Sequence, residues 1–98
     1  MSEPTDLSRK ILIVDDYGFN LTALKNILKY GFKIDTDAIV ETAMDGDQAI
    51  KKVKDNIQQN LGECCDFILI LMDIQMPRKD GYQATVQIRD LIHQAGLV

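Results

Sequence analysis

The sequence predicts an α/β fold in which an open, parallel sheet carries helices on both of its faces. Short apolar segments alternate with longer amphipathic segments along the chain, in a strand–helix order that occurs three times. Such an order implies parallel strands joined by right-handed crossovers. The length of 98 residues suits one domain, and 46% hydrophobic with 27% charged residues is typical of a globular protein.

Three segments have the character of strands. Residues 10–14 are rich in β-branched and leucine side chains, which predicts a strand in the interior of the sheet. The second strand is expected at residues 38–43, where β-branched residues precede an Asp-Gly turn signal, whereas residues 32–37 are ambiguous. Residues 67–72 are six consecutive apolar residues, too few for a surface helix and typical of a buried parallel strand. This last run is the strongest core signal in the chain.

Three further segments have apolar residues at helical spacing. They cover residues 20–30, 47–61 and 82–95. Asn20 is the expected N-cap of the first helix, and a glycine follows each helix as a stop signal. The side chains expected on the core-facing sides include Ile27, Leu61 and Val86.

Composition also excludes several classes of function. A net charge of −4, from 11 basic and 15 acidic residues, argues against a nucleic-acid surface or a polybasic membrane patch, and the lysines at positions 51, 52 and 54 suit a solvated helix face. No apolar run approaches the ~20 residues that span a bilayer, and no signal peptide is recognisable. Cys64 and Cys65 are adjacent, which disfavours a disulfide between them and a zinc site. We therefore expect a cytoplasmic location, with residues 1–9 as a flexible leader and residues 10–98 as the folded domain.

Acidic residues follow two of the predicted strands. Asp15 and Asp16 come directly after the first strand, and Asp73 comes directly after the third. In an open α/β sheet, ligands bind beyond the carboxyl ends of the strands, so the three carboxylates would meet there if these strands are neighbours. Their mutual repulsion would be relieved by protonation or, more simply, by a cation, and all-oxygen ligands favour Mg²⁺. An aspartate beside Mg²⁺ can act as a nucleophile toward phosphorus. Any one of these aspartates alone would more simply start a loop or cap a helix.

Three motifs resemble the receiver domain of response regulators, in the style of receivers attached to hybrid histidine kinases. They are ILIVDD at 11–16, MDIQMP at 72–77 and DGYQAT at 80–85. The resemblance implies a flavodoxin-like fold with strand order 2-1-3-4-5. It also implies that Asp73 is the phosphoacceptor and that Asp15, Asp16 and the main-chain carbonyl of Gln75 bind Mg²⁺ together with Asp73. Pro77 and Gly81 would shape the following loop, Met76 is expected to pack in the core, and His93 is expected to be an ordinary surface residue.

The resemblance is incomplete at its carboxyl end. Receivers have two more strands, which supply a Ser or Thr and a Lys that contact the phosphoryl group, and neither has a counterpart in this sequence. Smaller departures are extra residues at 32–37 and a lengthened third strand. A receiver truncated after its third helix would have an apolar third strand at the edge of a 2-1-3 sheet. We therefore expect either self-association through this strand or a fragment of a longer chain.

The leading hypothesis is a phosphoacceptor receiver of a two-component phosphorelay. A phosphoryl group would move from a phosphohistidine of a histidine kinase or histidine phosphotransfer protein to Asp73 with the help of Mg²⁺, which is at most self-phosphorylation and not classical enzyme activity. The alternative is a shortened receiver that acts as a protein-interaction module without being phosphorylated. A Mg²⁺-dependent phosphohydrolase would normally carry an aspartate where Gln75 stands, and no dinucleotide-binding or P-loop motif occurs.

Overall fold

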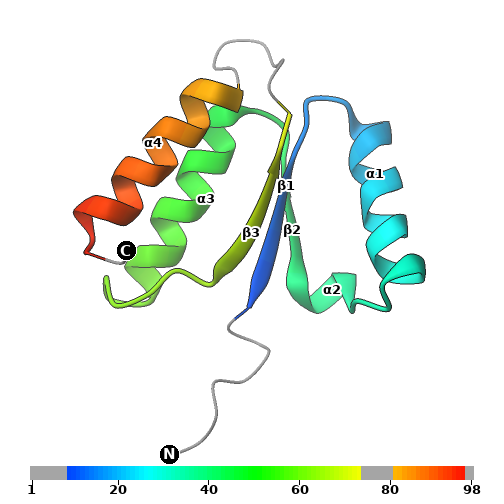
Figure 1. Ribbon diagram of the computed structural model, residues 1–98, viewed down its shortest axis with the longest axis horizontal. Coiled ribbons are helices and arrows are strands. Elements are labelled where there is room, and N and C mark those ends of the chain that lie inside the picture. Colours follow the sequence, from blue (N-terminus) through cyan, green and yellow to red (C-terminus); the bar gives the residue numbers. More distant parts are fainter. Residues whose placement is uncertain (1–8, 74–80, 97–98) are drawn as a thin grey trace, which may run out of the picture.

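The structure is a computed structural model that describes residues 9–73 and 81–96 (Figure 1). The expected leader lies almost wholly outside the described residues. The elements in chain order are β1 (Lys10–Val14), α1 (Gly18–Asn26), the π-helical turn η2 (Ile27–Gly31), α2 (Thr36–Ile39), β2 (Val40–Ala43), α3 (Gly46–Gln59), β3 (Phe67–Met72) and α4 (Gly81–Gln94).

The three strands form one parallel sheet in the order β2-β1-β3. The central strand β1 is the short apolar segment that was expected in the interior, and its residues Leu12 and Ile13 are fully buried. Burying one such side chain contributes about 1.5–3 kcal/mol. The predicted α/β class, the parallel sheet and the adjacency of the first and third strands are confirmed.

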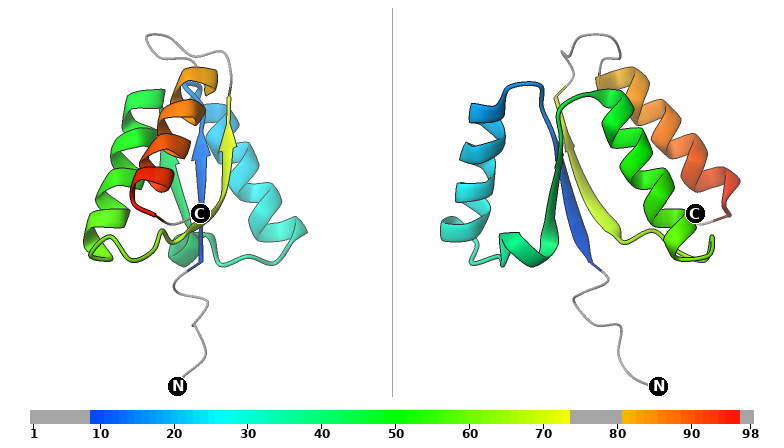
Figure 2. Two further views of the ribbon diagram at one scale, coloured as in Figure 1. Left: turned by 60° about the vertical axis from the view of Figure 1, so that its left-hand side comes forward. Right: turned by 180° about the vertical axis from the view of Figure 1, so that it is seen from behind.

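Helices cover both faces of the sheet. In Figure 1, α1 and α2 lie on one side of the strands and α3 and α4 on the other, and the two views of Figure 2 show the same layers. Successive side chains of a strand point to opposite faces, so β1 supplies both cores. Leu12 and Val14 pack with Val53 of α3, whereas Ile13 packs with Leu21 of α1.

Three side chains predicted to face the core do not do so. Ile27 is 54% exposed because the α-helical path of α1 ends before it and the chain continues as η2. Leu61 lies beyond the end of α3, has a left-handed backbone (φ 57°) and is exposed. Val86 is also exposed, since α4 turns Ala84 and Ile88 toward α3 and the sheet instead.

The second strand is shorter than expected. Residues Thr36–Ile39 form the single helical turn α2, and only Val40–Ala43 pair with β1. The expectation of a strand starting at residue 38 was therefore wrong by two residues. Ile39 still packs against the core on the α1 side of the sheet, although it does not pair with β1 as a strand residue.

The apolar run of β3 is an edge strand of the described sheet, not a buried one. Ile68 is 64% exposed and Leu69 is 45% exposed, and β1 is the only strand that pairs with β3 within residues 9–73 and 81–96. Pairing is also irregular at its start: Lys10 is opposite Phe67 but Ile11 is opposite Leu69, so Ile68 is an extra residue in β3.

A buried asparagine fixes where β3 begins. Asn56 of α3 is only 5% exposed, and its side chain accepts a hydrogen bond from the backbone N–H of Asp66 (2.7 Å) and donates one to the Asp66 carboxylate (3.0 Å). The backbone carbonyl of Asp66 then accepts a hydrogen bond from the N–H of Lys10 (2.7 Å). These bonds connect α3, the segment before β3 and the start of β1.

Candidate metal and phosphoacceptor site

The site forms where β1 and β3 end side by side. Val14 and Met72 are opposite each other in the parallel register, and the N–H of Asp73 donates to the carbonyl of Val14 (2.9 Å). The residues that follow the two strands therefore leave the sheet at the same edge. One carboxylate oxygen from each of Asp15, Asp16 and Asp73 lies within 4.8 Å of the others.

Asp15 is held firmly in place by its neighbours. It is 9% exposed, and its N–H donates to the carbonyl of Ala43 in β2 (3.1 Å). Its Oδ1 accepts a hydrogen bond from the backbone N–H of Tyr17 (3.0 Å), and its Oδ2 accepts one from Nδ2 of Asn20 (3.2 Å). The backbone and both oxygens of this residue are thus fixed.

The other two aspartates are open to solvent to different degrees. Asp16 is exposed and Asp73 is half-buried. Asp15 and Asp73 also line a pocket of about 350 Å³, together with Asn20, Leu24 and Leu71. A small ligand can therefore reach the carboxylates from solvent.

The donor set suits a hard divalent cation. Three carboxylate oxygens of like charge within 4.8 Å repel one another, and a cation between them turns this repulsion into attraction. Oxygen ligands favour Mg²⁺ or Ca²⁺ over the softer transition metals, and Mg²⁺ commonly takes one or two carboxylates with waters completing its coordination. The residues present therefore fit a magnesium ion.

The remaining residues that the sequence singled out lie elsewhere. Gln75, Met76 and Pro77 lie outside the described residues. Gly81 is buried at the start of α4, and its carbonyl accepts a hydrogen bond from Oγ1 of Thr85 (2.7 Å). His93 is exposed near the end of α4, as expected of a surface residue.

Sequence reasoning missed one residue of this site, Asn20. It was predicted to be the N-cap of the first helix, but α1 begins at Gly18, with Tyr17 as the N-cap. Asn20 is the third helical residue and directs its amide back to Asp15. Asn20 follows Asp15 by five residues and so falls in the first turn of the helix after the strand. This spacing was the available signal that its side chain could reach Asp15.

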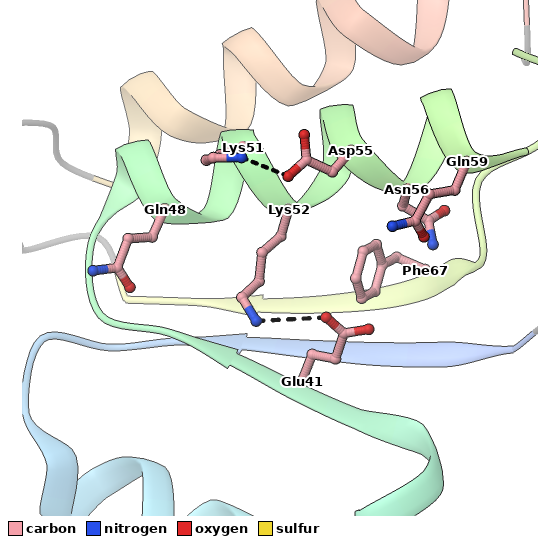
Figure 3. A pocket seen from close by; sticks show the side chains of 8 residues that line it. All are labelled: Glu41, Gln48, Lys51, Lys52, Asp55, Asn56, Gln59 and Phe67. Carbon is pink, nitrogen blue, oxygen red and sulfur yellow. Dashed lines mark hydrogen bonds and ion pairs between the residues drawn. The ribbon is translucent and has the colours of Figure 1, made fainter. Parts of the chain in front are cut away.

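A second hollow, of about 400 Å³, lies between α3 and the sheet (Figure 3). Lys52 lies 3.5 Å from the Glu41 carboxylate across this hollow, and Lys51 pairs with Asp55 on α3 (2.7 Å). Lys10 also pairs with Glu41 (3.0 Å). These charges compensate one another, so the hollow offers no comparable excess of one charge. Lys51 and Lys54 are exposed, as expected of a solvated helix face, whereas Lys52 is half-buried beside Glu41.

Both cysteines are free, with Cys64 exposed and Cys65 half-buried. Burial raises the pKa of the Cys65 thiol above its ordinary value, and the nearby Asp66 and Cys64 add to this effect, although a backbone hydrogen bond from Phe67 opposes it. A membrane-spanning helix does not occur in the part of the chain that the structure describes.

Comparisons with known proteins agree with this geometry. The family model of the response regulator receiver domain matches residues 11–97. Histidine kinase 3 of Arabidopsis thaliana is 42% identical over 86 residues, which are 87% of this chain and 7% of that protein. Chemotaxis protein CheY of Bacillus subtilis is 34% identical over 93 residues, which are 94% of this chain and 66% of that protein.

Solved structures resemble the fold as well. The receiver domain of the histidine kinase CKI1 from Arabidopsis thaliana complexed with Mg²⁺ superimposes with a TM-score of 0.79 at 30% identity, covering 92% of this chain and 62% of that one. The chain thus spans just under two thirds of these relatives, or far less where they are whole kinases. With a family match over nearly all its length, the same parallel fold and an acidic cluster at the strand ends, the chain belongs to the response regulator receiver domain family of two-component signalling.

Proposed function

We propose that this chain is a phosphoacceptor receiver that takes a phosphoryl group from a phosphohistidine onto Asp73. The observation that carries the proposal is the set of three carboxylate oxygens, from Asp15, Asp16 and Asp73, within 4.8 Å of one another at the ends of β1 and β3. Asp73 is half-buried, its N–H donates to the carbonyl of Val14, and the residue lines the pocket from which a ligand can approach. These are the requirements for a nucleophile that must meet a bulky phosphodonor.

The transfer needs little chemistry from the protein beyond positioning. A carboxylate oxygen of Asp73 attacks phosphorus, the O–P bond forms, the N–P bond breaks, and the departing imidazole nitrogen is left to be protonated by solvent. Asp15 and Asp16 would hold Mg²⁺ together with Asp73 and, by the family resemblance, the carbonyl of Gln75. Bound Mg²⁺ would neutralise the charge on the transferring phosphoryl group.

The partner that this proposal requires is a histidine kinase or a histidine phosphotransfer protein. Beside the acidic cluster, the exposed rings of Tyr17 and Phe19 lie with their centroids 6.0 Å apart. Exposed aromatic side chains are frequent energetic centres of protein interfaces. We infer that these two rings contact the phosphodonor protein while its histidine reaches Asp73.

We also propose residues 10–98 as the receiver unit and a cytoplasmic location. The second point is supported by Cys64, an exposed free thiol next to another free thiol, which persists best in a reducing compartment.

A second candidate function is supported by the outer edge of β3. Ile68 and Leu69 are exposed there on a strand with no charged residue, and such an edge favours pairing with another chain. Under this alternative the chain is an interaction module that self-associates through β3 and is not phosphorylated. Sedimentation of the wild type and of Ile68→Lys tests it: a wild-type monomer at high concentration contradicts self-association, and so does an oligomer that the lysine leaves unchanged.

The experiment that tests the leading proposal is incorporation of phosphate from acetyl phosphate, followed by intact mass. We expect a gain of one phosphoryl group that requires Mg²⁺ and is lost in Asp73→Asn. Asp90→Asn, which removes one negative charge from an exposed position on α4, is the matched control and should be labelled like the wild type. Labelling that survives Asp73→Asn, or wild-type protein that is never labelled, would refute the assignment.

A further inference from the structure

The side chain of Asn20 contacts Asp15, one of the proposed metal ligands, and not the helix to which it belongs. As the third residue of α1 it could have taken part in capping, yet its Nδ2 donates to Oδ2 of Asp15 at 3.2 Å. Asn20 is exposed, whereas Asp15 is buried. The contact therefore lies at the rim of the site, between solvent and the carboxylate.

Each oxygen of the Asp15 carboxylate accepts a hydrogen bond from a different donor. The backbone N–H of Tyr17 binds Oδ1, and the amide of Asn20 binds Oδ2. A carboxylate held at one oxygen can still rotate about its Cβ–Cγ bond, but one held at both has its plane fixed. Each oxygen can accept more than one hydrogen bond or ligand, so this arrangement orients the group and leaves room for a cation.

The neutrality of the donor is also important. A lysine or arginine at position 20 would compensate the charge of Asp15 and compete with a divalent cation for it. An amide donates a hydrogen bond without adding a full positive charge. Asn20 can therefore orient Asp15 while the acidic cluster keeps its three negative groups.

We propose that Asn20 is a positioning residue that holds Asp15 in the orientation required for Mg²⁺ and so sets the affinity of the site for this ion. The inference rests on the proposed Mg²⁺ site. Hydrogen-bond partners of metal ligands typically contribute about 10- to 100-fold to metal affinity. Asn20 is exposed and adds nothing to the core, and its amide makes one hydrogen bond to Asp15, so replacing it should affect ion binding more than folding.

The test is calorimetric titration of the whole chain with Mg²⁺, with urea unfolding in EDTA measured in parallel. Asn20→Leu keeps the size of the side chain and removes the donor, and we expect it to weaken Mg²⁺ binding about tenfold while the protein stays folded, with at most a small loss of stability in EDTA. Asn20→Gln keeps an amide donor and should recover most of the affinity. Asn26→Leu is the matched control, since Asn26 is an exposed asparagine at the end of the same helix.

The outcomes separate this inference from the proposed function. Wild-type protein that does not bind Mg²⁺ defeats the proposed function itself. If the wild type binds and Asn20→Leu binds equally well, only the role of Asn20 is overturned. Equal weakening by Asn20→Gln and Asn20→Leu would overturn it too, because the donor would then not be what matters. If the leucine variant does not fold, Asn20→Ala replaces it, and its affinity for Mg²⁺ is compared with those of the wild type and Asn20→Gln.

Discussion

The acidic cluster should destabilise the protein when no cation is bound, and Asp16→Asn tests this. Asp15 and Asp16 are neighbours in sequence, so their repulsion is largely present in the unfolded chain as well. Folding adds the repulsion between Asp16 and Asp73, whose nearest oxygens lie within 4.8 Å. Two unit charges at that distance repel by about 1 kcal/mol in a dielectric close to that of water, which suits an exposed residue.

Without Mg²⁺, the variant should therefore be more stable than the wild type by about 1 kcal/mol, or roughly 4–8 °C in Tm for a domain of this size. With Mg²⁺ at a hundredfold excess over its Kd, the wild type should gain about 2.7 kcal/mol. The variant should gain less, because it has one charged ligand fewer. The Asp16 and Asp73 carboxylates are closer than the ~10 Å Debye length at 0.1 M salt. Moderate salt should therefore reduce the stability gain of Asp16→Asn in EDTA only in part.

The assay is urea unfolding at low ionic strength, in EDTA and in a series of Mg²⁺ concentrations. Asp90→Asn makes the same change of charge far from the cluster and should differ from the wild type by less than about 0.5 kcal/mol in either condition. The reasoning is refuted if Asp16→Asn is no more stable than the wild type in EDTA. It is refuted equally if Mg²⁺ stabilises both proteins to the same extent.

Three further predictions concern other parts of the chain. Asn56→Ala should lower the free energy of unfolding by about 1–3 kcal/mol, because the N–H of Asp66 loses its buried acceptor; a urea midpoint equal to that of the wild type would contradict this. Iodoacetamide at pH 8 should modify Cys64 before Cys65, since the raised pKa of the Cys65 thiol leaves less thiolate there, and the difference should narrow as the pH rises. Peptide mass spectrometry measures both rates, and equal rates at pH 8 would count against the burial of Cys65. Phe19→Ser should slow phosphotransfer from a histidine phosphotransfer protein about tenfold but leave labelling by acetyl phosphate unchanged; slowing with both donors would place the effect of the ring on the site itself.

The sheet and the approach of the three aspartates could be foreseen because both follow from local patterns. Apolar runs with an aspartate at each carboxyl end locate β1 and β3, and parallel pairing then brings those ends together. The strand order came from the family resemblance, since no periodicity specifies which strands are neighbours. The roles of Asp73 and of the metal ligands remain predictions.

What could not be foreseen depended on contacts between distant segments. Ile27 and Val86 have the spacing of core residues, yet their exposure is decided by where α1 changes to η2 and by how α4 is rotated against α3. Asn20 was assigned to capping because asparagine favours that position, and the competing acceptor on Asp15 outweighed the local preference. Lys52 was assigned to solvent because Glu41, its partner, lies eleven positions away on another element.

The bulge at Ile68 lies between the pair Lys10–Phe67 and the regular register that starts at Ile11 and Leu69. We expect a residue inserted or deleted at the bulge itself to leave the bonds of Asp66 before it and the register up to Met72 in place. The same change between Leu69 and Asp73 would displace Asp73 by ~3.3 Å and turn it to the opposite face of the sheet. Homologous chains should therefore vary in length at the bulge and keep a constant number of residues from the position of Leu69 to the aspartate.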